Sequence, residues 1–543
     1  MRDEEKDPRA RPGLPRLALG ALGGAVAGFA ALAVAESVSA AVRPQAGPVV
    51  AVGGAAIDRT PAAVKDWAIR HFGTDDKLVL QLGILAVLTV LALASGVLAV
   101  RHRRVGAAGV LLLGAVGAAA ALSRPDSTGS ADALPSLAGA LAGAALLYLL
   151  AGRLTAPPRP RGAPSGATAP ALEAGAADDG DWDRRGFVVA AVSAAAASAA
   201  VGVFGRSLNG SRGHEAVVSR QRVVLPRPAS PARALPAGAA LQLPGISPFV
   251  TRNRHFYRVD TALVVPKVDA TDWRLRIHGR GVRDRAVLTY DDLLRRRLVE
   301  RDITLTCVSN EVGGPYVGNA RWIGVPLADL LAEYGVEPPS RGGPADQLVS
   351  RSVDGMTIGT PVEDVMDGRD ALLALGMNGE PLPFEHGFPV RMVVPGLYGY
   401  VSACKWIEDI ELTTFDAYDP YWVKRGWSRR APVKTESRID TPKPFARPKA
   451  GTVTVAGVAW AQHRGIERVE IQVDDGPWRP ARLAAEDTRD TWRQWWFPWQ
   501  ATPGGHTLTV RATDRTGAVQ TAARTRTIPD GASGRHSVVL TVE

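Results

Sequence analysis

Long hydrophobic stretches occupy the first part of the chain, and shorter alternating segments occupy the rest. About 20 apolar residues cross the hydrocarbon core of a bilayer, with about 17 as the lower limit, so the long stretches predict an N-terminal all-α transmembrane bundle. The third and fifth stretches lie close to that limit. The five stretches are Leu17–Val42, Leu78–Val100, Val105–Leu122, Ala133–Leu154 and the alanine-rich Phe187–Phe204.

Arginines mark one side of these stretches. They precede the first, fill the turn between the second and third, and separate the fourth from the fifth, whereas the other loops carry more acid. Alternation of five spans puts all three basic groups on one side, and basic flanks face the cytoplasm. We therefore expect a multi-pass cell-membrane protein that contacts lipid and holds its C-terminal part on the extracytoplasmic side. The basic residues are Arg9, Arg11, Arg16, Arg101, Arg103, Arg104, Arg153, Arg159, Arg161, Arg184 and Arg185.

The predicted spans carry little that could hold haem or move protons. His71 and His102 lie at or beyond the span ends, and Glu36 is the one ionisable exception inside them. This argues against a bis-histidine haem and against an ion pathway, and favours an anchor or a docking surface for a partner. The pair Arg184-Arg185 looks like an internal twin-arginine export signal, and an ordinary basic flank explains it equally well.

Short alternating segments begin near residue 247 and predict an α+β domain over 247–440. Four transmembrane helices (1–155), a cytoplasmic linker (156–186), a fifth helix (187–205) and a second linker (206–246) precede it. The expected strands are Trp273–Gly279, Ile303–Thr306, Val390–Val394 and Trp406–Leu412, and the expected helices are Thr289–Leu294 and Pro326–Tyr334.

A proline-rich basic segment, Thr441–Lys449, separates this domain from an all-β region at 450–543. About seven short strands within this length predict an immunoglobulin-like sandwich. Four tryptophans in Trp492–Trp499 suit its core, although tryptophan also gathers at interfaces. The clearest strands are Val453–Trp460, Val469–Val473, Trp492–Trp499 and His506–Ala512.

Charge and cysteine content narrow the chemistry. The net charge is +10, but the arginines are scattered or flank apolar spans, which argues against nucleic acid and favours lipid headgroups or an anionic ligand. Only two cysteines are present, so no disulfide framework is expected. Cys307 follows a short apolar strand and precedes a Gly-rich loop. A thiolate there could attack carbon or bind a soft metal, and a buried structural cysteine is the plain alternative.

The chain from about Pro248 to Val519 resembles the sulfite oxidase family of molybdenum-cofactor enzymes. Several stretches match in the expected order, and together they cover about half of the chain. They are Asn253–Tyr257, Leu305–Asn310 around Cys307, Gly318–Leu327, Met377–Pro383, His386–Arg391 and Pro395–Trp406.

The resemblance implies an α+β molybdopterin domain with Mo-molybdopterin as cofactor, and a C-terminal domain of the dimerisation type. Cys307 matches the family's metal ligand, and soft sulfur suits a redox-active metal. Arg391 and Lys405 are the natural partners for the pterin phosphate. Ser352 is a looser match. The other matched cofactor contacts are Asn253, Phe256, Tyr257, His386, Ala403 and Cys404.

Each matched residue also has a structural explanation. Lys405 could cap a strand edge, His386 could be satisfied by backbone, and Cys404 could be a small core residue. Phe256 and Tyr257 suit a core as well as a cofactor wall. Arg391 differs, because an arginine in a buried apolar strand needs an anion.

One departure concerns the substrate. Animal and plant members carry an arginine shortly after the cysteine, where this chain has Asn310, Glu311 and Val312. A carboxylate at contact distance would repel a dianion by about 1–4 kcal/mol. Another arginine must therefore supply the charge, or the substrate is not sulfite. The candidates are Arg252, Arg254, Arg321 and Arg425, and Tyr257, Arg321 and Tyr421 are candidate pocket groups.

We therefore expect an oxidoreductase that transfers an oxygen atom to or from a small sulfur compound such as sulfite. Its catalytic residues would be Cys307, Arg321 and Tyr257. A reductase of methionine sulfoxide in exported proteins and a non-enzymatic membrane scaffold are the alternatives. Because no haem module precedes the domain, a separate cytochrome or quinone-linked partner must carry electrons, and the chain could form a homodimer.

Overall fold

The computed structural model describes residues 13–61, 64, 67, 68, 71, 72, 76–125, 127, 129–155 and 184–543. The chain divides into two compact units, Met1–Arg212 and Gly213–Glu543. The expected flank at Arg9 and Arg11, and residues 156–183 of the expected linker, lie outside the described residues.

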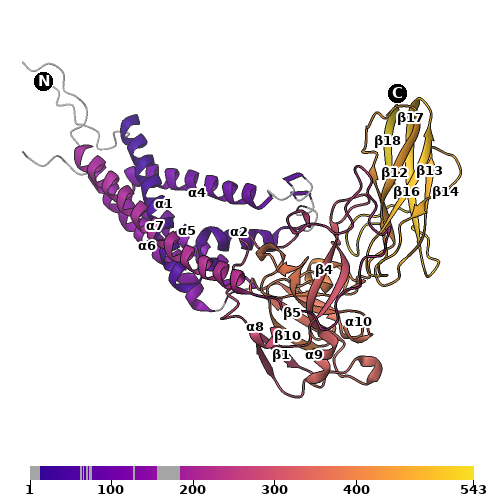
Figure 1. Ribbon diagram of the computed structural model, residues 1–543. Coiled ribbons are helices and arrows are strands. Elements are labelled where there is room, and N and C mark those ends of the chain that lie inside the picture. Colours follow the sequence, from indigo (N-terminus) through magenta and orange to yellow (C-terminus); the bar gives the residue numbers. More distant parts are fainter. Residues whose placement is uncertain are drawn as a thin grey trace, which may run out of the picture. The chain divides into compact units, whose positions relative to one another are not determined.

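The first unit is helical, as its hydrophobic stretches predict (Figure 1). Five helices in the described part are long and apolar enough to cross a membrane, which confirms the apolar spans; the side on which each end lies stays a prediction. The helix α2 and the short helices η1 and η3 were not predicted. The elements are α1 (Leu14–Val42), η1 (Pro44–Ala46), α2 (Pro48–Arg59), α4 (Asp76–Arg101), α5 (Arg103–Leu122), η3 (Ser130–Ala133), α6 (Leu134–Thr155) and α7 (Arg184–Arg222).

Small residues set the packing of α1 against its neighbours. A Cβ atom at Gly24 would lie 2.1 Å from the carbonyl oxygen of Ala92 in α4, and one at Gly139 in α6 would lie 2.4 Å from that of Ala31. Such contacts are impossible for larger residues, so the helices approach each other through their backbones. Close approach of this kind drives helix association in apolar surroundings.

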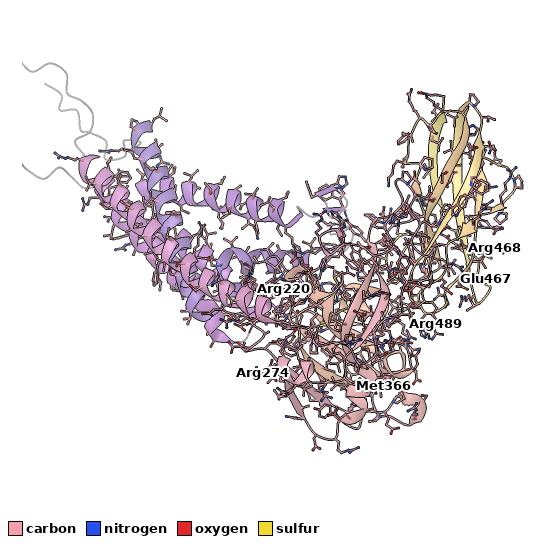
Figure 2. The ribbon with its side chains drawn as sticks, viewed as in Figure 1. Arg220, Arg274, Met366, Glu467, Arg468 and Arg489 are labelled. Carbon is pink, nitrogen blue, oxygen red and sulfur yellow. The ribbon has the colours of Figure 1, made fainter. Side chains whose placement is uncertain are left out.

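Helix α7 corrects the expected linker at 206–246. It continues to Arg222, because residues 206–222 contain no proline and include good helix formers such as Ala216, Glu215 and Arg220. Arg220, labelled in Figure 2, donates to the carbonyl oxygens of Leu382 (2.7 Å) and Pro381 (2.7 Å). The end of α7 is therefore fixed to the β-rich unit in which Arg220 lies.

The α+β part of the second unit contains two five-stranded sheets around one hydrophobic core. The first has the order β2-β1-β10-β5-β6, and the second has β3-β4-β7-β8 with β9 paired to β7. These elements confirm the predicted strands and helices to within a few residues. The strands are β1 (Arg274–Gly279), β2 (Ala286–Thr289), β3 (Val299–Thr306), β4 (Val317–Pro326), β5 (Gln347–Ser352), β6 (Thr357–Pro361), β7 (Leu372–Met377), β8 (Glu380–Pro381), β9 (Arg391–Val393) and β10 (Ile407–Thr413).

Short helices connect these strands. The first, α8, begins with a capping box in which Thr289 and Asp292 satisfy each other's backbone N–H groups, as its sequence predicts. The helices are η4 (Asn253–His255), α8 (Tyr290–Leu294), α9 (Leu327–Glu333), η5 (Pro339–Arg341), α10 (Val362–Met366), η6 (Phe384–His386), α11 (Gly399–Ser402) and η7 (Val423–Arg425).

The C-terminal region is all-β, as predicted, and has two four-stranded sheets (yellow in Figure 1). Their facing sides share a core that includes the fully buried Trp495, and Trp492 and Trp499 are also buried. The immunoglobulin-like fold stays a prediction. The sheets are β11 (Glu436–Thr441), β12 (Gly451–Trp460), β16 (Arg493–Ala501), β15 (Arg482–Leu483), and β14 (Arg479–Pro480), β13 (Ile466–Val473), β17 (Gly504–Asp514), β18 (His536–Val542).

Strand β11 comes before the expected domain boundary at Thr441–Lys449, although it belongs to the domain that follows. It pairs antiparallel with β12 and so belongs to the C-terminal sheets. Its sequence, Glu-Ser-Arg-Ile-Asp-Thr, is mostly polar, and the hydrophobic pattern alone did not identify it.

Candidate functional site

Cys307 lies directly after β3, in a turn held by main-chain hydrogen bonds. Its N–H donates to the carbonyl oxygen of Tyr316 (2.9 Å), and its own carbonyl accepts from the N–H of Asn310 (3.0 Å). The Asn310 side chain in turn accepts from the N–H of Tyr316 (2.7 Å). The thiol is buried and does not form a disulfide with Cys404. The turn therefore fixes a reduced sulfur at the end of the sheet.

A second segment, Asn253–Tyr257, is locked by side-chain contacts. Asn253 accepts from the Asn378 amide (2.7 Å) and donates to Glu380 Oε1 (2.6 Å). Its carbonyl oxygen accepts a hydrogen bond from Nε2 of His386 (2.9 Å). Burial is the main cause that lowers the pKa of His386 to about 4, so this imidazole is neutral near pH 7.

An aromatic cluster connects this segment to β4. The ring of Phe256 stacks on that of Tyr257 (5.1 Å between centroids) and meets those of Trp322 (5.9 Å) and His386 (5.6 Å) edge to face. Such arrangements hold rings rigidly. Phe256 is buried and packs in the main core, so it is a core residue whatever else it contacts.

Arg391, in β9, is a buried cation with incomplete pairing. Its guanidinium lies 5.0 Å from the Trp322 ring centroid and donates to the carbonyl oxygen of His386 (3.1 Å). Its Nε is buried with no hydrogen-bond partner, and no carboxylate forms an ion pair with it in the described part of the chain. Burial lowers its pKa to about 10. An anionic ligand would satisfy this group.

Cys307 and Arg391 both act electrostatically on the Tyr257 phenol, so the three side chains belong to one region. Burial raises the pKa of the Tyr257 phenol, Cys307 raises it further, and Arg391 opposes both. A Cβ atom at Gly399, where α11 begins, would lie 4.0 Å from the Tyr257 hydroxyl and 3.7 Å from the carbonyl oxygen of Thr306. The start of α11 therefore lies beside the strand end that precedes Cys307.

Lys405 forms another wall of the same region. Its ammonium contacts Asp260 Oδ2 (2.7 Å) and the carbonyl oxygen of Glu385 (3.2 Å), and lies 4.5 Å from the Trp406 ring. Gly387 has φ +111°, and a Cβ atom there would lie 3.2 Å from the Lys405 backbone. The turn after His386 therefore packs directly on Lys405.

The remaining matched residues lie around these walls. Ser352 is buried and ends β5. It pairs with Ile407 of β10, which follows Lys405 by two residues. The Ala403 N–H donates to the carbonyl oxygen of Gly399 (3.0 Å). Burial raises the pKa of the Cys404 thiol to about 12, which makes it a poor nucleophile.

Two predicted pocket residues have partners elsewhere in the domain. Arg321 makes two hydrogen bonds to Asp302 (2.9 and 2.7 Å) and adjoins Trp322 on β4, so its side chain lies on the opposite face of the sheet. Tyr421 hydrogen-bonds through its N–H to Thr357 Oγ1 (3.1 Å), and the Arg425 guanidinium lies 3.5 Å from its ring. Arg321 and Arg425 are thus engaged elsewhere.

A cavity of about 600 Å³ opens next to the Cys307 turn. The loop that follows Cys307 and the segment that precedes Phe256 both line it, and strands β11 and β18 complete it. Of the four candidate arginines, Arg252 lines this cavity; exposed Arg254, like Arg321 and Arg425, does not. Its polar lining includes Arg252, His255, Arg438, Asp440, Lys443 and His536.

Residues of the C-terminal sheets were missed as part of this site. Arg438 donates to the carbonyl oxygen of Gly314 (2.7 Å) and pairs with Asp440 (2.7 Å). Gly313 has φ +79°, and a Cβ atom there would collide with the His536 ring at 2.2 Å. No local sequence signal marks these residues, because they meet the Cys307 loop only through the tertiary fold.

Arg524 lies beside the position where the expected arginine is absent. A Cβ atom at Gly534 would lie 3.3 Å from Arg524 Cγ and 3.4 Å from Val312 Cγ2, so these two side chains flank the same glycine. The base of the exposed Arg524 side chain, from the C-terminal region, therefore lies close to Val312.

The donor set fits a metal cofactor that ends in a phosphate. It combines the buried thiol of Cys307 with the buried guanidinium of Arg391, whose Nε has no partner. The ammonium of Lys405, which donates to the carbonyl oxygen of Glu385, adds a second cation. Soft sulfur suits a redox metal, and guanidinium and ammonium groups suit phosphate.

Comparison with known proteins agrees with this chemistry. Residues 262–422 match the family described as oxidoreductase molybdopterin binding domain, which implies Mo-molybdopterin as the cofactor. Human mitochondrial sulfite oxidase is 29% identical over 291 residues, 46% of this chain and 52% of the relative, and the Drosophila melanogaster enzyme is 32% identical over 301 residues, 47% and 50% respectively. The chain thus spans about half the length of these curated relatives.

Two further matches complete the comparison. The sulfane dehydrogenase SoxCD structure from Paracoccus pantotrophus is 26% identical with a TM-score of 0.46, covering 55% of this chain and 84% of that one. The uncharacterized oxidoreductase YuiH of Bacillus subtilis is 32% identical over 162 residues, which cover 30% of this chain and 75% of the relative. The chain belongs to the sulfite oxidase family of molybdopterin-binding oxidoreductases.

Proposed function

We propose that this protein oxidises a small sulfur oxyanion of the sulfite class by oxygen-atom transfer. The observation that carries the proposal is a shared wall: the loop that follows Cys307 also lines a cavity that carries Arg252. A substrate in that cavity would lie between the thiol-bearing turn and a cation.

Cys307 would ligate molybdenum, and the pterin dithiolene would supply two further sulfurs. When bound, this cofactor supplies two-electron oxygen-atom exchange. Arg391, with its unpartnered Nε, and Lys405 would hold the pterin phosphate, which requires Lys405 to share or leave Asp260. Asn253, Tyr257, Ser352, His386 and Ala403 would line the pterin.

The chain's own cations would bind the substrate. Arg252, with His255 beside it, comes from one wall of the cavity, and Lys443 comes from the other. His536 also lines the cavity, but burial lowers its pKa to about 4, so it is neutral near pH 7. Glu311, whose charge would repel an anion, is exposed and is not among the residues that line the cavity. We therefore place the anion between these cations, with Arg524 reinforcing the field near Val312.

We further propose that the five apolar helices anchor this unit on the extracytoplasmic side of the cell membrane. The arginine-rich flanks support that orientation. The C-terminal sheets would form an immunoglobulin-like module, and a separate redox protein would carry the electrons.

The test uses the full chain in detergent, loaded with molybdenum. Sulfite should reduce ferricyanide, whereas sulfoxide reduction by a reduced viologen dye should be slow. Faster turnover of methionine sulfoxide than of sulfite would replace this proposal with a sulfoxide reductase.

A matched pair of variants locates the substrate. Arg252→Gln should raise KM for sulfite about tenfold or more, because it removes a cation that lines the cavity. Arg254→Gln, two residues away and outside the cavity, should change KM less than twofold. Equal effects of the two variants would contradict the proposed pocket.

A further inference from the structure

Phe445 is unusual among the exposed side chains of the second unit. Of the large hydrophobic side chains exposed in residues 213–543, the other six are valines, and Phe445 is 83% exposed. An aromatic ring held in water is a typical anchor of a protein interface, whereas scattered valines need no explanation.

The backbone of Phe445 is also unusual. Its φ of +61° lies in the left-handed region, which bulky residues rarely adopt. The conformation is held because its N–H donates to the carbonyl oxygen of Val539 (2.8 Å). Glycine or asparagine would adopt this conformation at lower cost, so phenylalanine here is typical of strain kept at a functional site.

The segment Lys443–Lys449, here called the rim segment, covers the edge of β18. Beyond Phe445, the Thr541 N–H donates to Ala446, and the Glu543 N–H donates to Pro448 (2.9 Å). Pro444 and Pro448 have no N–H to offer on the outer side. Another strand could therefore not add to this edge, and a partner must be recognised through side chains.

The rim segment is basic and adjoins the cavity. Lys443, Arg447 and Lys449 are exposed, and Arg447 lies 3.4 Å from the terminal residue Glu543. Lys443 and Pro444 also line the cavity, together with Gly313 and Pro315 of the loop that follows Cys307. A second copy of the chain, docked here about a two-fold axis, would bring these cations face to face. An acidic partner would instead complement them.

We propose that the rim segment, with Phe445 as its anchor, docks a small acidic protein that carries one electron at a time. This inference rests on the proposed function: conversion of sulfite and water to sulfate releases two protons and two electrons, so two oxidised carriers are reduced in each turnover. Docking at the cavity rim brings the acceptor next to the Cys307 turn.

The test uses the loaded full chain in neutral-lipid nanodiscs and an acidic soluble c-type cytochrome as probe. Phe445→Gly removes the ring and suits φ +61°, so it should not lower the melting temperature. We expect it to raise both Kd and KM for the cytochrome at least tenfold, while ferricyanide reduction stays unchanged. Lys449→Glu should raise both constants about fivefold and weaken their dependence on salt.

Controls lie on a different edge of the same unit. Val287 and Arg285 are likewise exposed, at and beside β2, and Val287→Ser and Arg285→Glu should leave Kd and KM within twofold of wild type. A basic cytochrome c should bind at least tenfold more weakly than the acidic one.

Three results would overturn the docking proposal. One is an unchanged cytochrome Kd in Phe445→Gly. Another is that Phe445→Gly and Lys449→Glu lose co-flotation with phosphatidylglycerol vesicles while their KM for the cytochrome is unchanged. That result would assign the rim segment to lipid binding. The third is a dimer in wild type that Phe445→Gly dissociates. If sulfite fails to reduce ferricyanide, the proposed function fails instead, and the Kd measurement still tests docking.

Discussion

The two faces of the sheet that carries the candidate site differ in how completely an arginine is paired. On one face, Arg391 stacks on Trp322 with a buried Nε that has no partner. On the other, Arg321 is closed by two hydrogen bonds to Asp302. The two arginines come from strands β9 and β4 of one sheet, which both pair with β7, so the contrast reflects what each face of that sheet holds. The charge of Arg321 is satisfied by Asp302 within the protein, whereas the charge of Arg391 would be satisfied only by a bound anion.

The same contrast applies to the two cysteines. Cys307 lies in a turn and adds to burial in raising the pKa of the Tyr257 phenol, and the loop that follows it lines the cavity. Cys404 is enclosed in the main core, with a thiol that burial keeps protonated. Substitutions on the two sides of each contrast should therefore differ in kind as well as in size.

The largest effect is expected at Cys307. Cys307→Ser should lower kcat on the order of 10³-fold or more, about 4 kcal/mol of barrier, while the melting temperature and pterin content stay near wild type. Cys404→Ala should lower kcat less than tenfold and cost about 1 kcal/mol of stability. Steady-state kinetics with sulfite and ferricyanide measure both. Equal losses in the two variants would remove the special role of Cys307.

The next effect separates the two arginines. Arg391→Met should reduce pterin content at least tenfold, yet leave the cofactor-free protein as stable as wild type or slightly more stable, because it removes an uncompensated buried charge. Fluorescence of the extracted, oxidised pterin and thermal unfolding of the cofactor-free chain give the two readouts.

Arg321→Met should behave in the opposite way. It leaves Asp302 buried without its cation, next to Asp487, whose pKa is raised to about 6 by burial and by Asp302. We expect a loss of about 1–2 kcal/mol, since Arg321 is one-third exposed, and an unchanged pterin content. A drop in pterin content as large as that of Arg391→Met would show that Arg321 serves the site after all.

The last effect is confined to acidic pH and concerns His386. Its folded pKa of about 4 lies below the ordinary value of 6.5, so the unfolded chain binds more protons between these pH values. Its contribution is present above pH 6.5 and is lost as the pH falls toward 4, by at most about 3 kcal/mol. Besides burial, the charges of Arg391 and Lys405 lower the pKa of His386, and that of Glu385 raises it.

His386→Gln should therefore flatten the stability profile over this window in the cofactor-free chain. Denaturant unfolding at pH 4.5, 5.5 and 7 measures the difference from wild type. A variant whose profile stays parallel to that of wild type would contradict the assignment.

Local pattern predicted much of this molecule. The apolar spans, the capped helix at Thr289 and the strand that ends before Cys307 follow from residue spacing. Alternation along β4 could also have placed Arg321 opposite Trp322, and a motif match is blind to that periodicity.

Other features have no local signal. His536 and Arg438 reach the cavity from strands more than a hundred residues after Cys307, so only the tertiary fold brings them there. The polar strand β11 and the continuation of α7 to Arg222 were missed because neither has the hydrophobic period that identifies an element.

X-ray absorption at the molybdenum edge of the purified, loaded chain tests the central assignment most directly. We predict a sulfur shell with the two pterin sulfurs and one protein thiolate, which falls by one sulfur in Cys307→Ser. An identical sulfur shell in wild type and Cys307→Ser would contradict the account.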